Sequence, residues 1–314
     1  MKRPAHKVKR LITWTLLAAS LIYIIYEVHS FNSLWDSLAR VSVKKAITAA
    51  LFVFLLMLLN WGIEAKKWQY LVLKVLTQYS YLISLQTVIS GITLGLFTPN
   101  RVGEYGARIF YVENEHKADL LIFAFIDRIA QLWVTIFIGL GFTFLYVVHI
   151  LQEYLYFILA CAVLLFIFHV TVIFMRNKII RFVVNQKRLK RYFTEKIFLS
   201  WRDVIVVLGY AAVRYIVFVL QYLIWGYYTD ENYSIQAGLI CVNTMLFIKS
   251  VVPSAGLSEL GIRESVLMYT YKSYGLSTFT AFHSALAIYV INLLIPGIIG
   301  LLFIMRAALK SSEV

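Results

Sequence analysis

The 314-residue sequence is poor in charged residues and carries none of the familiar signatures of an enzyme or a metal site. Only 15% of its residues are charged, against about 25% in a typical soluble domain, while 61% are hydrophobic. It has no His-rich cluster, no Asp-x-Asp pair, no nucleophile elbow and no nucleotide-binding motif. Its two cysteines, Cys161 and Cys241, lie in apolar runs without metal-ligand spacing. These absences argue against a soluble enzyme, a metal site or an ATP-driven motor, and we expect no cofactor.

The hydrophobic residues are gathered in long runs, which the core of a soluble protein does not need. Each is long enough, or nearly so, to cross about 30 Å of hydrocarbon as a helix. The runs cover residues 11–26, 46–59, 132–148, 155–175 and 204–225. Lipid offers no partner to backbone amides, and the alternating pattern of a barrel is absent. The sequence therefore predicts an all-α integral membrane protein in which residues 1–314 form one membrane domain.

Basic residues set the predicted orientation of the chain. Nine of the 30 basic residues fall between Arg176 and Arg202, and the first ten residues are basic too. Such loops usually mark the cytoplasmic side, where they meet anionic headgroups. We therefore place the loop 176–203 and both termini in the cytoplasm, with the protein in the cytoplasmic (inner) membrane. A nucleic-acid partner is the less favoured interpretation of these charges.

The charge distribution allows about six full crossings and leaves two apolar segments that do not cross. The crossings are predicted near 11–28, 46–63, 119–148, 155–175, 204–228 and 278–305. The second of these is expected to end at the membrane surface at Glu64, Lys66 and Lys67. Segments 81–117 and 235–275 are predicted to be re-entrant hairpins, the first entering from the cytoplasm and the second from outside, which is possible where protein or a wet cavity covers the backbone.

The two predicted hairpins share a motif. Glu-x-Gly-x-Arg occurs at 104–108 and again at 259–263, each time shortly after a proline. Residues 1–150 and 151–314 then align as helix, helix, hairpin, helix, with the two halves in opposite orientations. This is the inverted-topology repeat of many secondary transporters, which bind substrate near the midplane where the broken segments meet.

The residue types at the two tips suit an anionic ligand. Arginine presents a planar fork that fits phosphate, and a neighbouring glutamate can hold that fork or carry a proton. The candidate binding residues are Arg101, Glu104, Arg108, Arg214, Glu259, Arg263 and Glu264. Glycines and prolines permit tight turns at the tips, and the candidates are Pro99, Gly103, Gly106, Pro253, Gly256 and Gly261.

Two adjacent charges, Asp127 and Arg128, lie about ten residues into the predicted crossing at 119–148. Charges at such depth are costly and are functional candidates by default. The alternative is a purely structural ion pair, for instance between Asp127 and Arg214.

At LGLFTPNRVGEYGAR (94–108) and VVPSAGLSELGIRES (251–265) the sequence resembles the lysylphosphatidylglycerol synthase transmembrane (flippase-like) family. The resemblance covers about residues 10–308, although Ala255-Gly256 stands where a Gly-Gly pair is more usual. In two-part members a membrane domain of this type precedes an aminoacyl-transferase. The resemblance implies lipid translocation without lysyl transfer, with any partner enzyme encoded separately.

The leading functional hypothesis is therefore a translocase, not an enzyme, that flips or scrambles a lipid with an anionic headgroup. The partner lipid would be an anionic phospholipid or a polyprenyl-phosphate-linked intermediate. Other functions stay open on the sequence alone. They are a membrane-embedded enzyme acting on a lipid phosphate, and a secondary transporter of small solutes or an accessory subunit of a cell-envelope pathway.

Overall fold

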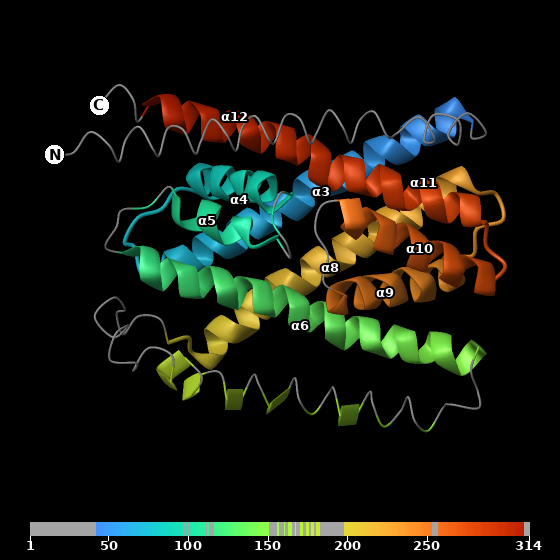
Figure 1. Cartoon of the computed structure of the whole chain (residues 1–314), viewed down its shortest axis with the longest axis horizontal. Helices are drawn as coiled ribbons and strands as arrows, with labels where there is room; N and C mark the ends of the chain where they lie inside the picture. Colours follow the sequence, from blue (N-terminus) through green and yellow to red (C-terminus); the bar gives the residue numbers. More distant parts are fainter. Residues whose placement is uncertain are drawn as a thin grey trace.

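The computed structural model describes residues 42–96, 98, 101–110, 112, 116–150, 198–252 and 257–310, with scattered positions between 156 and 182. These residues form helices and short connections, and no strand occurs among them (Figure 1). The predicted crossings at 11–28 and 155–175 and the basic loop 176–203 lie wholly or mostly outside the described residues. The predicted tip residues Pro99, Pro253 and Gly256 lie outside them as well.

Four helices are long and apolar enough to cross a membrane. They are α3 (Val43–Val72), α6 (Lys117–Ile150), α8 (Trp201–Thr229) and the continuous helix Thr278–Arg306. At 1.5 Å per residue, the 30 residues of α3 extend about 45 Å, more than the hydrocarbon thickness. The prediction of an all-helical integral membrane protein is confirmed at this level.

The last long helix contains an irregular turn at its middle. It consists of α11 (Thr278–Tyr289), a π-helical turn η6 (Val290–Leu294) and α12 (Ile295–Lys310). Pro296 lies two residues after the turn, and Asn292 donates from Nδ2 to the carbonyl oxygen of Ile288 at 3.1 Å. Proline removes a backbone donor and the amide side chain binds a backbone acceptor, so the local sequence accounts for the widened turn.

Four shorter helices form two hairpins. The first pairs α4 (Tyr81–Leu96) with α5 (Gly103–Phe110), and the second pairs α9 (Ile235–Val251) with α10 (Leu257–Ser273). In Figure 1 the first hairpin lies toward the left end of the long helices and the second toward the right end. The second hairpin packs against α6 and α11, and the first packs against α3 and α12.

Helix α3 extends beyond its predicted end at Glu64. The helix runs on to Val72, and Glu64, Lys67 and Trp68 are all buried. Charged groups on α5, α6 and α8 surround this turn and compensate the charges of Glu64 and Lys67. The prediction that the helix ends at Glu64 was wrong because hydropathy counts these charges as exposed, whereas the tertiary structure pairs them inside the bundle.

The packing of α8 against α3 is fixed at one end by a capping interaction. Ser200 and Asp203 form a reciprocal capping box at the start of α8. Asp203 also accepts a hydrogen bond from Tyr70 at 2.5 Å and pairs with Lys74 at 2.5 Å. One carboxylate thus both starts α8 and attaches it to the end of α3.

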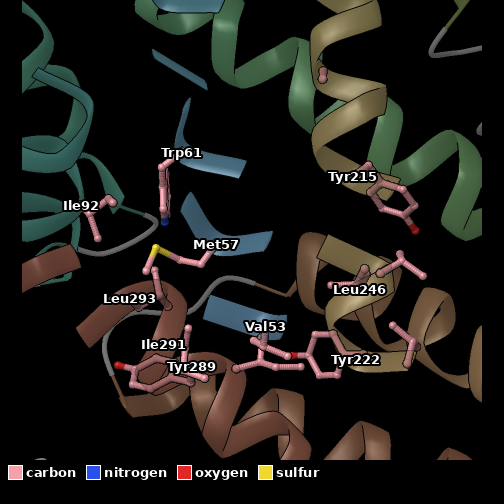
Figure 2. Close-up of a cluster of buried hydrophobic side chains, with 14 of the residues drawn as sticks. Val53, Met57, Trp61, Ile92, Tyr215, Tyr222, Leu246, Tyr289, Ile291 and Leu293 are labelled. Carbon is pink, nitrogen blue, oxygen red and sulfur yellow. The ribbon is translucent and has the colours of Figure 1, made fainter. Parts of the chain in front are cut away.

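The apolar core lies where α3, α8 and the π-helical turn meet. Figure 2 shows Met57 and Trp61 of α3 beside Leu293, with Tyr215 and Tyr222 of α8 on the other side of the cluster. Trp61, Tyr215 and Leu293 also line the cavity described next, so the core and the candidate site share a wall.

Candidate functional site

A cavity of about 450 Å³ lies between the two hairpins. Its size falls within the range of small-ligand sites, roughly 300–1,000 Å³. It is bounded by α3, α6, α8, the end of α9, α10, η6 and the turn before α5. Six of the residues that line it have charged side chains, and they are Arg101, Arg128, Arg214, Lys249, Glu259 and Arg263.

The charged side chains that line this cavity belong, with their ionic partners, to three groups, which we name by position. The α5 group consists of Arg101, Glu104 and Arg128. The α10 group consists of Lys249, Glu259 and Arg263. The central group consists of Glu64, Lys67, Arg108, Asp127 and Arg214.

The central group joins four helices through two carboxylates. Glu64 of α3 accepts from Arg108 at 2.5 Å through Oε1 and from Arg214 at 2.6 Å through Oε2. The ammonium of Lys67 lies 2.8 Å from Glu64 and 2.9 Å from Asp127. Arg108 also reaches Asp127 at 3.3 Å. Charge-assisted pairing of this kind offsets the cost of placing five ionised groups inside a membrane protein.

Three of the arginines make cation–π contacts with aromatic rings. The guanidinium of Arg108 lies 4.7 Å from the ring centroid of Trp68, and that of Arg214 lies 5.2 Å from Trp61. Arg263 lies 5.6 Å from the ring of Phe218. Cation–π contacts leave the edge of the guanidinium plane free to donate hydrogen bonds.

The α5 group sits on a strained turn. Arg101 has φ of 60°, in the left-handed region that is uncommon for a non-glycine residue. Its Nε lies 2.6 Å from Glu104, and Arg128 of α6 lies 3.7 Å from the other oxygen of that carboxylate. Gly103 permits the turn, since a Cβ there would lie 2.1 Å from the carbonyl oxygen of Leu94.

The α10 group closes the cavity from the second hairpin. Glu259 Oε1 lies 2.5 Å from Arg263 Nη2, one helical turn away, and 2.7 Å from Lys249 at the end of α9. Glu259 and Arg263 are both buried. The carboxylate therefore links the two arms of the hairpin directly beside the cavity.

The two Glu-x-Gly-x-Arg motifs make different contacts despite their identical spacing. In α10, Glu259 and Arg263 pair with each other. In α5, Glu104 pairs with Arg101 and Arg128, whereas Arg108 turns to Glu64 and Asp127. Asp127 and Arg128, adjacent in sequence, also belong to different groups because successive helical side chains point in different directions. The alternative ion pair of Asp127 with Arg214 is not formed, since Arg214 pairs with Glu64.

Of the seven predicted binding residues, four line the cavity, Glu104 and Arg108 pair with charged groups beside it, and Glu264 stands apart. Arg101, Arg214, Glu259 and Arg263 line it. Gly106 and Gly261 lie within helices α5 and α10, where a Cβ would meet no atom within 4 Å. Glu264 is half-buried, does not line the cavity and makes no ion pair among the described residues.

Sequence reasoning missed Glu64, Lys67 and Lys249. The first two looked like the end of a helix, although the apolar residues Leu71 and Val72 continue the pattern beyond them. Lys249 is a single charge near the end of an apolar segment, and it faces Glu259 only because α9 and α10 fold back on each other. A charge flanked on both sides by apolar helix was the available signal in each case.

One edge of the cavity is formed by apolar side chains that are also exposed on the outside of the bundle. Phe125, Ile129 and Leu132 of α6 line the cavity and are each more than one third exposed. Val251 and Val252, at the end of α9, also line the cavity and are also more than one third exposed. In a membrane these residues would contact acyl chains, so charged groups and lipid-facing surface meet at one site.

Comparison with protein families gives one match. The family described as Lysylphosphatidylglycerol synthase TM region matches residues 11–306, nearly the whole chain. No match is found among curated proteins.

Proposed function

Because the chain belongs to the lysylphosphatidylglycerol synthase TM region family, we propose that it moves lipids with anionic headgroups between the leaflets of a membrane. The family description denotes a membrane region, which fits a role in lipid handling rather than aminoacyl transfer. The observation that carries the proposal is the cavity, which brings cationic groups of both hairpins beside an exposed apolar edge.

The headgroup would occupy the cavity while the acyl chains stay in lipid. Arg101, Lys249 and Arg263 would bind the phosphate, because guanidinium and ammonium groups form strong charge-assisted hydrogen bonds with its oxygens. The apolar edge at Phe125 and Val251 would let the chains remain outside. A closed aqueous vestibule, as a soluble solute requires, would have no need for such an edge.

The two hairpins would provide alternating access as the tips of an inverted repeat. We propose that α4–α5 and α9–α10 are re-entrant and enter from opposite faces, one in residues 1–150 and one in 151–314. Their placement toward opposite ends of the long helices supports this arrangement (Figure 1). Rocking one half against the other would expose the cavity to each leaflet in turn.

A reconstituted translocation assay tests the proposal. Proteoliposomes containing the full chain and a fluorescent anionic phospholipid should show faster leaflet exchange than protein-free vesicles, read by quenching of the outer leaflet. Arg263→Gln should reduce the protein-dependent rate at least about tenfold, since a hydrogen bond to a charged group contributes about 1.5–3 kcal/mol.

The matched control is Lys45→Gln, which removes a cation from an exposed pair with Glu231 at the end of the bundle. It should keep the wild-type rate. Because Arg263 is buried, thermal unfolding of each variant in detergent must be measured alongside. Full exchange by a folded Arg263→Gln protein, or exchange by the wild type no faster than in empty vesicles, would contradict the proposal.

A further inference from the structure

The three ionic groups around the cavity share an uncompensated positive charge. Among the described residues the α5 group has two cations and one carboxylate, and so does the α10 group. The central group has three cations and two carboxylates. The network therefore contains seven basic and four acidic side chains, an excess of three positive charges. Counting Glu264, which lies on α10 but away from the cavity, would still leave an excess of two.

Such an excess is costly within a membrane unless a ligand balances it. Unpaired buried charge is strongly destabilising, as the effect of removing one partner of a buried ion pair shows. Several of these basic side chains are shielded from solvent by the surrounding helices. Arg108 and Arg263 are each at least nine-tenths buried, and the side chain of Arg101 is only 12% exposed.

Two of the cavity-lining arginines also retain unused donors. Nε of Arg263 and Nη2 of Arg101 are buried and have no hydrogen-bond partner in the described part of the chain. One arginine belongs to each hairpin, and both line the same cavity. Buried donors normally have partners, so this pair indicates an acceptor-rich ligand between the hairpins.

We infer that the headgroup bound in this cavity carries at least two negative charges on phosphate, as a phosphomonoester or a diphosphate does. This inference deepens the proposed function, on which it rests for the lipid part of the ligand. A phosphomonoester has a charge of about −1.5 to −2 at pH 7 and three acceptor oxygens. A phosphodiester headgroup has a single charge and would balance only one of the three groups. A headgroup bearing an added amine would be repelled by the same cations.

The ligand would bridge the hairpins. Its oxygens would accept from Arg101 on one side and from Arg263 and Lys249 on the other, with Arg128 and Arg214 adding charge from α6 and α8. A singly charged headgroup would leave the surplus cation of one hairpin without a counter-charge. A ligand must therefore carry at least two negative charges to balance the cations of both hairpins at once.

Binding to the purified full chain tests this inference. Phosphatidic acid, a phosphomonoester, and phosphatidylglycerol, a phosphodiester, would be compared with identical acyl chains, by the rise in unfolding temperature in detergent and by native mass spectrometry. Inorganic phosphate and pyrophosphate would be tested in parallel to distinguish a lipid headgroup from a free anion. Phosphatidic acid should bind at least about tenfold more tightly than phosphatidylglycerol at pH 7.5, the effect of one further charge-assisted hydrogen bond.

The preference should depend on pH through the ligand. The second phosphate pKa is about 6, so the advantage of phosphatidic acid should shrink as the pH falls to 5 and this charge is lost. Lys249→Gln should reduce the preference, and Arg263→Lys, which keeps the charge but not the planar fork, should weaken binding less than Arg263→Gln. Lys45→Gln should leave the preference unchanged.

Equal binding of the two lipids at pH 7.5, or a preference that Lys249→Gln leaves intact in a folded protein, would overturn the inference. Tight binding of pyrophosphate with no added effect of acyl chains would assign the site to a free anion and overturn the lipid part. Leaflet exchange of both lipids at one rate would retain the translocase and reject the charge requirement. Selective binding of phosphatidic acid without any leaflet exchange would retain the charge requirement and reject the translocase.

Discussion

At the scale of single residues, the balance of charge within each ionic group is the property that decides what a substitution does. In the central group Asp127 forms ion pairs with Lys67 and Arg108, while Glu64 forms ion pairs with Lys67, Arg108 and Arg214. The group is therefore short of negative charge, and its members are not equivalent. Removing a carboxylate and removing a cation have opposite effects on the imbalance.

This asymmetry gives a prediction for Asp127→Asn. The change raises the excess of positive charge in the central group from one to two, so we expect the free energy of unfolding to fall by about 3 kcal/mol. SDS-induced unfolding in mixed micelles, followed by far-UV circular dichroism, would measure it.

Lys67→Met is the matched comparison, because methionine has a similar length and its introduction leaves two guanidiniums facing two carboxylates. We expect a loss within about 1 kcal/mol. An equal loss in the two variants would show that local packing, and not the charge balance, governs stability at this site.

At the scale of helices, close approach depends on a few small residues. Helix α12 packs against α4 so tightly that a Cβ at Gly300 would lie 2.4 Å from the carbonyl oxygen of Ile89. Thr93 donates to the carbonyl oxygen of Gly297 at 2.8 Å across the same contact. Small residues play this role widely in membrane helix packing.

Gly300→Ala should therefore separate α4 from α12 and lower the free energy of unfolding by about 1–3 kcal/mol, the usual cost of overpacking. Heat denaturation in detergent would measure the change. Gly141→Ala in α6 is the control, because a Cβ there meets no atom within 4 Å. Replacing glycine inside a helix without a clash should stabilise by about 0.5–1 kcal/mol. Similar losses at both positions would contradict the proposed close contact.

At the scale of the whole molecule, the two ends of α3 identify two sides. Lys45, at its start, pairs with Glu231 at 2.7 Å, which places the 230–234 connection beside that end. Gln78 is exposed just beyond the opposite end of α3. Since α3 is long and apolar enough to cross, we expect Gln78 and Asn232 to lie on opposite faces of the membrane.

Cysteine labelling tests this arrangement in intact cells, with both native cysteines replaced by serine. A membrane-impermeant maleimide should label Asn232→Cys without permeabilisation and Gln78→Cys only after it, if the basic loops are cytoplasmic as predicted. The reverse pattern would invert the orientation and keep the fold. Labelling of both positions from one side would contradict a full crossing by α3.

The sequence by itself determined that this chain is a helical membrane protein and where its two pairs of shorter helices lie. Long apolar runs require helices in lipid, and the repeated Glu-x-Gly-x-Arg motif marked α5 and α10 before any contact was known. Only the tertiary structure decided which charges meet. Glu64, Lys67 and Lys249 join the site because helices distant in sequence place partners around them, and hydropathy, which scores each residue alone, counts a charge without its partner.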